Sequence, residues 1–476
     1  MIMNAHCPAG VQSTIQRKHW PFGNLAAIAM SHDDGEELIE SEHKAVRSVS
    51  KDYGSTKLTD TTIRWLNLGI VAFATLLVLV FILVPKQPHK ISILPKGFAV
   101  STTHYLATEA AAKVLRDGGT AADAAAVAQF VLNVAQPQST GIGGGCFILH
   151  YNASTGIVNA IDGREEAPSA LEASSFCSNP QCTSPVSPFF PNRCSGGLAV
   201  GVPGTVAAVD RMLKTFGSIS FRDAVAPAAA LARNGVPMSA HLYDKITTSN
   251  ARLRWFNASA KLFLNQDRSK PVAEIGELWY NPDIAATLDE LGSKGAIEFY
   301  RGQIASDIVL SASSAVNPTT GTVGVLTLED MFQYAAVERQ PVKFTYEGHT
   351  IYSMPPPSSG GLILGLSLNI LEAVPSFGLA PRQSASTLAT LINSNNIAWA
   401  DRGPYIADAD FFNVPSEGLL SKAYAKARSA LLPQSNPQQA LETPISSGSP
   451  PGALSGPSGV GDTNQGTCFT YCSGRD

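Results

Sequence analysis

Arg164 is the residue whose type and position best suit the binding of an anionic group. It lies in the segment Ile161-Asp-Gly-Arg-Glu-Glu-Ala-Pro168, just after an expected strand and turn. A guanidinium at such a place can hold a carboxylate through two parallel hydrogen bonds. The same side chain could instead form an ordinary surface ion pair with Glu165 or Glu166. On residue types alone, the ion pair is the favoured interpretation.

A glycine-rich segment, Gln136-Pro-Gln-Ser-Thr-Gly-Ile-Gly-Gly-Gly145, precedes this arginine. Four glycines in five positions permit positive φ angles and a close approach of the backbone to another chain or a ligand. The segment is not a dinucleotide-binding fingerprint, because the third glycine would fall on Cys146 and a strand follows instead of a helix. It also lacks the lysine of a Walker loop. We predict a tight structural turn.

Three of the seven cysteines, Cys177, Cys182 and Cys194, lie within 18 residues of one another in a Ser-, Pro- and Asn-rich stretch. This spacing is typical of one local disulfide and an odd thiol in an oxidising compartment. A zinc site fits less well, because it needs four ligands and no histidine is near. We expect neither a metal nor a cofactor.

The composition allows a sizeable core and gives no sign of nucleic-acid binding. The chain has 476 residues, of which 44% are hydrophobic and 15% charged, with a formal net charge of −4. So small a net charge implies no basic face, and we therefore exclude nucleic acid as a partner.

The segment Leu66–Val84 is expected to cross a membrane. Its 19 residues carry no charge and include fourteen Leu, Ile, Val or Phe. As a helix it would span about 28 Å, close to the hydrocarbon core of a bilayer. A buried helix of a soluble protein is the alternative. A cleaved signal peptide fits less well, because some 65 mostly polar residues come first.

The flanking charges and the sequons suggest a type II orientation with the large carboxyl-terminal part outside the cell or in the lumen. Close to the apolar run, four basic residues lie on its amino side and three on its carboxyl side, namely Arg47, Lys51, Lys57 and Arg64 against Lys86, Lys90 and Lys96. Asn152-Ala-Ser and Asn257-Ala-Ser are candidate glycosylation sites. We expect a plasma-membrane or endomembrane protein with a disordered cytosolic tail over 1–65 and a tether over 85–97.

Helical and strand patterns alternate after the tether, which favours a layered α/β or αββα body. A capping pair, Thr120 and Asp123, predicts the start of a buried, alanine-rich helix that runs to about Val134. The composition changes at Pro433, and the Gly-, Ser- and Pro-rich residues up to 466 indicate a flexible linker. The remaining elements are expected as a strand over 98–101, helices over 106–116, 206–216, 221–233, 282–291, 361–372 and 384–401, and strands over 146–151 and 157–162.

Taken in order, these motifs resemble the heavy chain of the gamma-glutamyltransferase (gamma-glutamyltranspeptidase, glutathione hydrolase) family. The resemblance covers roughly 97–432. The motifs are Ala107-Thr-Glu-Ala-Ala, Gly118-Gly-Thr-Ala-Ala-Asp-Ala-Ala125, Pro137-Gln-Ser-Thr-Gly-Ile-Gly-Gly-Gly145, Asp162-Gly-Arg-Glu-Glu-Ala-Pro168, Gly201-Val-Pro-Gly204, Gly235-Val-Pro-Met238, Phe299-Tyr-Arg-Gly302, Pro355-Pro-Pro-Ser-Ser-Gly-Gly361, Ala398-Trp-Ala-Asp-Arg402 and Asp408-Ala-Asp-Phe411.

The resemblance implies an αββα sandwich of the N-terminal-nucleophile hydrolase type, incomplete without the light chain. The transmembrane helix expected from the apolar run is an addition to this sandwich. Such enzymes cut themselves before a threonine, whose hydroxyl then attacks the γ-glutamyl amide of glutathione and its conjugates. The γ-glutamyl group passes to water or to an acceptor amino acid or peptide. By matching motifs, Arg164 becomes the residue that holds the α-carboxylate, which reverses the interpretation reached from residue types.

The family's nucleophile matches Thr467, with Gly466 before the bond to be cut. The match is incomplete, because one residue is missing and Cys468 stands where Thr-His is expected. Beyond Thr470 the resemblance ends, and 467–476 read as a remnant of a light-chain start. The light chain would supply the inner strands and the oxyanion hole. We expect the chain as given to be incomplete without it, and inactive.

Three interpretations stay open. The sequence could be a shortened form of a true enzyme, or a catalytically dead ectodomain that acts as a binding or regulatory subunit with a separate light-chain-like partner. In the third, Cys468 or Cys472 replaces the nucleophile, although no base or oxyanion donor accompanies either cysteine.

Overall fold

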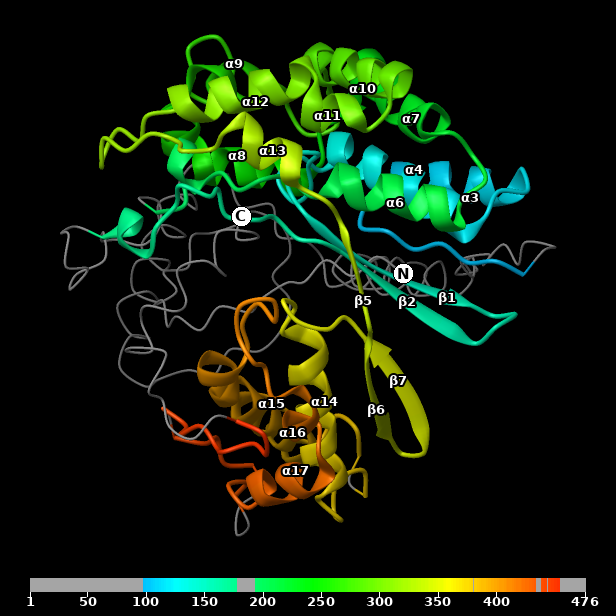
Figure 1. The fold of residues 1–476 in the computed structure, drawn as a ribbon, viewed down its shortest axis with the longest axis vertical. Helices are drawn as coiled ribbons and strands as arrows, with labels where there is room; N and C mark the ends of the chain where they lie inside the picture. The colour runs from blue at the N-terminus through cyan, green and yellow to red at the C-terminus, as the bar shows by residue number, and fades with distance from the viewer. Residues whose placement is uncertain (1–96, 178–192, 380, 434–437, 443, 454–476) are drawn as a thin grey trace, which may run out of the picture. The chain divides into compact units, whose positions relative to one another are not determined.

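The structure is a computed structural model, and its described part begins at Gly97 (Figure 1). The predicted tail, membrane helix and nucleophile, with Gly466 and Thr467, lie outside the described residues. Within the described part, no helix is both long and apolar enough to cross a bilayer. The described residues are 97–177, 193–379, 381–433, 438–442 and 444–453.

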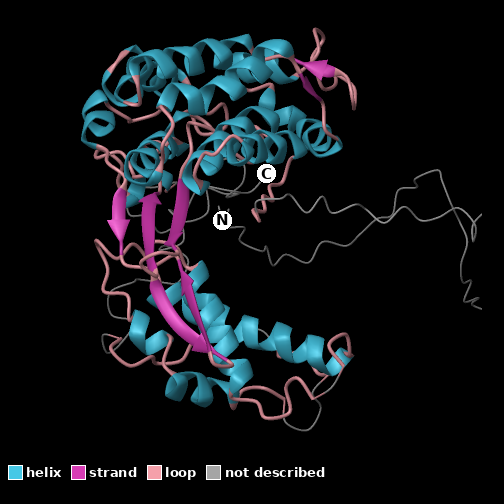
Figure 2. Cartoon of the chain, turned by 90° about the vertical axis from the view of Figure 1, so that its right-hand side faces the viewer, coloured by secondary structure: helices cyan, strands magenta, loops and turns pink. Residues whose placement is uncertain are grey.

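Most of the regular secondary structure of this part is helical, and the strands are few (Figure 2). The helices are α3 (Tyr105–Arg116), α4 (Ala121–Ala135), η1 (Ala173–Phe176), η2 (Gly197–Ala199), α6 (Thr205–Phe216), α7 (Phe221–Asn234), α8 (Ala240–Leu253), α9 (Asn257–Phe263), α10 (Pro282–Lys294), α11 (Ile297–Arg301), α12 (Gln303–Ser314), α13 (Leu328–Gln333), α14 (Gly360–Glu372), α15 (Ala385–Tyr405), α16 (Ser416–Leu419) and α17 (Lys422–Ser429). The strands are β1 (Cys146–Asn152), β2 (Ile157–Gly163), β3 (Val236–Pro237), β4 (Leu278–Trp279), β5 (Val337–Arg339), β6 (Val342–Tyr346) and β7 (His349–Ser353).

The first hydrophobic core is built around α4, which packs against α3, α6 and α7. The predicted capping pair is confirmed: the Thr120 hydroxyl accepts from the Asp123 amide, and the Asp123 carboxylate accepts from the Thr120 amide at 2.8 Å. The same carboxylate accepts from the amides of Ser218 and Ile219, at 2.7 and 3.2 Å. It therefore ties the start of α4 to the loop after α6, and the predicted burial of this helix is also confirmed.

A three-stranded antiparallel sheet in the order β1-β2-β5 lies against this core, with α6 packed on β1 and β2. Asp162 of β2 pairs with Val337 of β5 in the register. Side chains alternate between the faces of a strand, so Ile148 and Ile161 join the core. Phe147 and Asp162 therefore point to the opposite face.

A second hydrophobic core joins α14 to α15, α16 and α17, with the β6–β7 hairpin packed on α14. Leu362, Leu366 and Ile370 are spaced four residues apart on α14 and are all buried. One helical face therefore supplies much of this core.

Residues 444–453, which we call the strap, differ from the predicted flexible linker over 433–466. The Gly448 amide donates to Asp401 at 2.8 Å, and its carbonyl accepts from the Tyr405 hydroxyl at 2.6 Å. Composition indicates a linker, but these polar groups of α15 hold the backbone in place.

Two further differences concern strands. The segment 98–101 was expected to be a strand, but it belongs to no strand of the described sheets and pairs with none of them. The sequence patterns also did not indicate β5, β6 or β7. These strands are three to five residues long, too short for an alternating pattern to stand out.

Candidate functional site

Arg164 lies one residue beyond the end of β2, and two hydrogen bonds hold its backbone. Its amide donates to Oδ1 of Asp162 at 2.9 Å. Its carbonyl accepts from the hydroxyl of Tyr334, just after α13, at 2.7 Å. The peptide groups on both sides of the Cα are therefore fixed, and the side chain leaves the backbone in a defined direction.

The guanidinium of Arg164 is much less constrained than its backbone. Its Nε lies 3.7 Å from Oε2 of Glu165, and 27% of the side chain is exposed. That separation is longer than a hydrogen bond. Among the described residues, the guanidinium donates no hydrogen bond, and no ion pair joins it to Glu166. The expected surface ion pair therefore forms only loosely, and the donors of the guanidinium stay available for a carboxylate.

Tyr334 is held in place by a second tyrosine. Its ring stacks on that of Tyr300 with the centroids 5.6 Å apart. The Tyr300 hydroxyl donates to the Pro203 carbonyl at 2.8 Å and accepts from the Ala207 amide at 3.1 Å. Burial raises the pKa of both tyrosines. The Tyr334 hydroxyl therefore keeps its proton at neutral pH and can donate to the Arg164 carbonyl.

A second arginine, Arg339 of β5, lies beside Asp162. Its Nε donates to Oδ2 of Asp162 at 2.7 Å, and its two terminal nitrogens donate to the two oxygens of Asp410 at 2.8 and 2.7 Å. Hydrogen bonding to Asp410, and then to Asp162, raises the pKa of Arg339 although burial opposes the shift. Hydrogen bonding to Arg339 lowers the pKa of Asp410.

The glycine-rich segment has a packing role. A Cβ on Gly145 would lie 2.5 Å from Oε2 of Glu165 and 2.6 Å from the Gly163 carbonyl. The Gly144 carbonyl accepts from the amides of Gly204 and Thr205, at 2.9 and 3.0 Å, at the start of α6. The segment is thus a tight turn that packs against the residues flanking Arg164.

Cys146, which replaces the last glycine of a dinucleotide pattern, is not poised to react. Burial, together with the carboxylates of Glu165 and Asp162, raises the pKa of its thiol to about 12. Because the thiolate is the nucleophilic form, this residue is inert at neutral pH.

The predicted nucleophile Thr467 and its neighbour Gly466 lie outside the described residues, as do Cys468 and Cys472. Cys177 is disulfide-bonded. Cys182, a second member of the predicted cysteine cluster, also lies outside. The placement of the nucleophile therefore stays a prediction.

The two predicted glycosylation sites lie at the ends of elements. Asn152 ends β1, and its Oδ1 accepts from the amide of Ser154 at 3.0 Å. Asn257 begins α9 on an exposed position, and its Oδ1 accepts from Arg268. In both residues the side-chain oxygen accepts the hydrogen bond, so the nitrogen that would carry a glycan is not the atom engaged.

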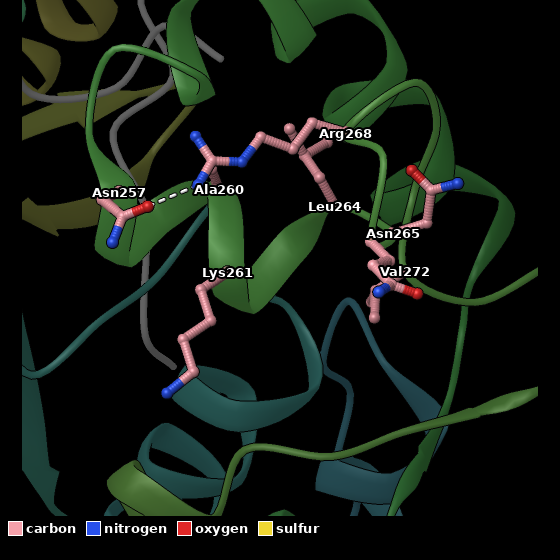
Figure 3. A pocket seen from close by; sticks show the side chains of 8 residues that line it. Asn257, Ala260, Lys261, Leu264, Asn265, Arg268 and Val272 are labelled. Atoms are coloured by element: carbon pink, nitrogen blue, oxygen red, sulfur yellow. Dashed lines mark hydrogen bonds between the residues drawn. The ribbon is translucent and has the colours of Figure 1, made fainter.

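A cavity of about 530 Å³ lies beside α9 (Figure 3). Arg268 reaches across to Asn257, whereas Lys261 points away from both. None of the lining residues belongs to the surroundings of Arg164. Among the described residues, no group of three or more His, Cys, Asp or Glu side chains could hold a metal ion. The candidate site is therefore the Arg164 loop and not this cavity.

Comparisons with known proteins agree with the motifs. Residues 107–476 match the family model described as gamma-glutamyltranspeptidase. The chain is 34% identical over 339 residues to the glutathione hydrolase proenzyme of Bacillus subtilis, covering 71% of this chain and 55% of that protein. It is 33% identical over 330 residues to the glutathione hydrolase proenzyme of Escherichia coli, covering 69% and 54%. The chain thus spans about half the length of the curated relatives it matches.

A solved structure shows the same fold. The gamma-glutamyltranspeptidase of Helicobacter pylori aligns with a TM-score of 0.66 and 33% identity, over 73% of this chain and 96% of that chain. The expected α/β class is confirmed by this match and by the layered helices and sheet of the first core. The resemblance carried by the motifs is confirmed as well: the chain belongs to the gamma-glutamyltranspeptidase family.

Proposed function

We propose that this chain is the large-subunit part of an enzyme that cleaves the γ-glutamyl amide bond of glutathione and its conjugates. The γ-glutamyl group then passes to water or to an acceptor amino acid or peptide. Family membership supports this reaction class, as do the relatives named glutathione hydrolase proenzyme.

The observation that carries the proposal is the contrast within Arg164 between a fixed backbone and an open guanidinium. Both peptide groups are hydrogen-bonded, yet the donors of the head group find no hydrogen-bond acceptor among the described residues. A planar guanidinium with free donors matches a carboxylate in a bidentate arrangement. We assign Arg164 to the α-carboxylate of the γ-glutamyl group.

The proposed chemistry begins with cleavage between Gly466 and Thr467. An α-amine ordinarily has a pKa of about 8 and is partly neutral near pH 7, so the freed amine of Thr467 can accept the hydroxyl proton. The hydroxyl oxygen attacks the γ-carbonyl carbon, an ester bond forms, and the amide C–N bond breaks as the leaving amine takes up the proton. Water or an acceptor amine then attacks the ester and regenerates the hydroxyl.

We also propose a light chain as the partner that completes the sandwich. Phe147, Leu149 and Tyr151 alternate with the core-facing residues of β1, and Val337 lies on the same face of β5. Tyr151 and Val337 are exposed. Phe147 and Leu149 are partly buried, so the row is partly exposed, and a partly exposed apolar row on this face of the sheet is what a second sheet layer would cover.

Membrane anchorage by 66–84, with the large domain outside the cell or in the lumen, is part of the same proposal. The disulfide at Cys177 suits an oxidising compartment, and Asn257 is exposed. In cells, the chain should stay in the membrane pellet after alkaline carbonate extraction, whereas a form lacking 66–84 should not. Treatment with an endoglycosidase should lower the apparent mass of the protein on a denaturing gel. Asn257→Gln should make this decrease in mass smaller. Carbonate release of the intact chain would contradict the anchor.

The enzymatic proposal is tested with protein expressed from the transcript, including any coding sequence that follows codon 476. Hydrolysis of a γ-glutamyl anilide is measured for the parent, Arg164→Ala and Arg164→Lys. A hydrogen bond to a charged group contributes about 1.5–3 kcal/mol, so the loss of even one of the two in Arg164→Ala should raise KM by at least roughly 10- to 100-fold. Arg164→Lys, which keeps the charge but loses the planar fork, should recover part of the loss.

Arg233→Ala is the matched control, because Arg233 pairs with Asp289 on an exposed surface. Its KM should equal that of the parent. An unchanged KM in Arg164→Ala would remove the basis of the assignment. A folded protein that leaves the anilide intact, even with the downstream coding sequence, would favour the catalytically dead binding subunit instead.

A further inference from the structure

Arg339 shares an acceptor with the backbone of Arg164. The Asp162 carboxylate uses Oδ1 for the Arg164 amide, at 2.9 Å, and Oδ2 for Nε of Arg339, at 2.7 Å. Only 5% of the Asp162 side chain is exposed. The Asp162 carboxylate therefore bridges the side chain of Arg339 and the backbone of Arg164. Because it is buried, water does not compete for these hydrogen bonds.

The far side of Arg339 is held as firmly. Both terminal nitrogens donate to Asp410, in a bidentate arrangement that leaves the guanidinium little freedom to rotate. Asp410 lies beyond the end of α15, and 53% of its side chain is exposed. An exposed carboxylate from beyond α15 thus fixes the partly buried arginine of β5.

Arg339 is surrounded by several carboxylates, and its positive charge offsets theirs. The carboxylates of Asp162, Asp410 and Asp408 all act on Glu166, the second residue after Arg164, and Arg339 is the cation that offsets them. Without Arg339, Asp162 would be a buried carboxylate among other anions, held only by the Arg164 amide. Such a carboxylate would lose the partner that orients it, and its movement would shift the Arg164 backbone.

We propose that Arg339 is a positioning residue for substrate binding. Clamped by Asp410, it orients the Asp162 carboxylate, and this carboxylate sets the backbone from which the Arg164 guanidinium reaches the substrate. The proposal rests on the proposed role of Arg164 and extends it to Asp162, Arg339 and Asp410, which act without contacting the substrate.

The first test needs no activity. In the full chain, hydrogen exchange of the Arg164 amide is compared between the parent, Asp410→Asn and Arg339→Gln. Exchange reports local opening of that hydrogen bond, and both variants should speed it by about tenfold or more. Asp410→Asn changes a surface residue, so it stays informative even if Arg339→Gln fails to fold.

Glu338→Gln is the matched control. Glu338 is the neighbour of Arg339 on β5, and its ion pair is made with Arg211 of α6, away from Asp162. This variant should leave the exchange of the Arg164 amide unchanged. Equal exchange in Asp410→Asn and the parent would overturn the proposal, as would an equal increase in Glu338→Gln.

The second test uses the active enzyme with a γ-glutamyl anilide. Asp410→Asn should raise KM several-fold and leave kcat nearly unchanged, and Arg339→Lys should be milder than Arg339→Gln. In an Arg164→Ala background, Asp410→Asn should change KM no further, because residues that act through one another are not additive. A full additive effect would overturn the proposal. If Arg164→Ala alone leaves KM unchanged, the assigned function of Arg164 fails, while amide exchange still decides whether Arg339 positions that backbone.

Discussion

Two regions of this protein place an arginine beside a buried aspartate, with opposite results. Near α15, the Asp401 carboxylate is fully buried and accepts from Arg428, from the Tyr424 hydroxyl at 2.8 Å and from the strap amide at 2.8 Å. Arg428 also donates to the Ser446 carbonyl of the strap at 2.9 Å. The head group of Arg428 therefore serves contacts within the fold.

Near β2, the corresponding aspartate is Asp162, and it binds the backbone of Arg164 instead of its guanidinium. The head group of Arg164 is left with one loose contact to Glu165. The comparison indicates that the role of an arginine depends on whether the fold binds its head group or only its backbone. Where the head group is engaged, the residue supports the structure; where only the backbone is engaged, the head group can serve a ligand.

The comparison is tested most severely by replacing each arginine with alanine. Arg428→Ala leaves Asp401 as a buried charge without its ion-pair partner, so the free energy of unfolding should fall by about 3–5 kcal/mol. Arg164→Ala removes a side chain whose head group makes no hydrogen bond within the described residues. The free energy of unfolding should therefore change by no more than about 0.5 kcal/mol. Urea denaturation of the two variants and the parent measures both values. Equal losses of stability would show that the contrast is false.

The turn beside Arg164 is tightly packed, although the head group of Arg164 is open, and a substitution in the turn can test this packing. Gly145→Ala forces a Cβ against Glu165 and the Gly163 carbonyl, and the overpacking should cost about 1–3 kcal/mol. Gly143→Ala is the control, because nothing lies within 4 Å of its added Cβ. Thermal unfolding should separate the two variants. Similar unfolding temperatures would mean that the turn is looser than its contacts indicate.

Local signals in the sequence account for much of the fold and, within the candidate site, for Arg164 but not for Arg339. The Thr120–Asp123 pair marks the start of α4, and the spacing of apolar residues marks α14. Arg164 can be found from the sequence because it follows a strand and belongs to a family motif. Arg339 cannot, because its partner Asp162 is 177 residues away and no local pattern records the pair. The order of the strap cannot be predicted for the same reason, since distant polar groups hold a segment whose composition is that of a linker.

The smallest expected effect concerns Glu166 and the acidic surroundings of Arg339. Partial burial raises its pKa first, then the carboxylates of Asp162, Asp408 and Asp410, while Arg339 opposes them. A raised carboxyl pKa in the folded protein means that the charged form is disfavoured there. The resulting penalty is absent below the ordinary pKa of a glutamate, grows as the pH rises towards the raised pKa, and is complete above it.

Glu166→Gln, which resembles the neutral form, should therefore unfold at a slightly higher temperature than the parent at pH 7. Because Glu166 stays substantially exposed despite its partial burial, solvent screens these charges and the gain should stay below about 1 kcal/mol. The difference should vanish as the pH falls below about 4. Glu338→Gln, which loses its ion pair with Arg211, should show no such gain at pH 7. A lower unfolding temperature for Glu166→Gln at pH 7 would mean that Arg339 attracts this carboxylate more strongly than its acidic neighbours repel it, and that Arg339 serves more carboxylates than Asp162 and Asp410.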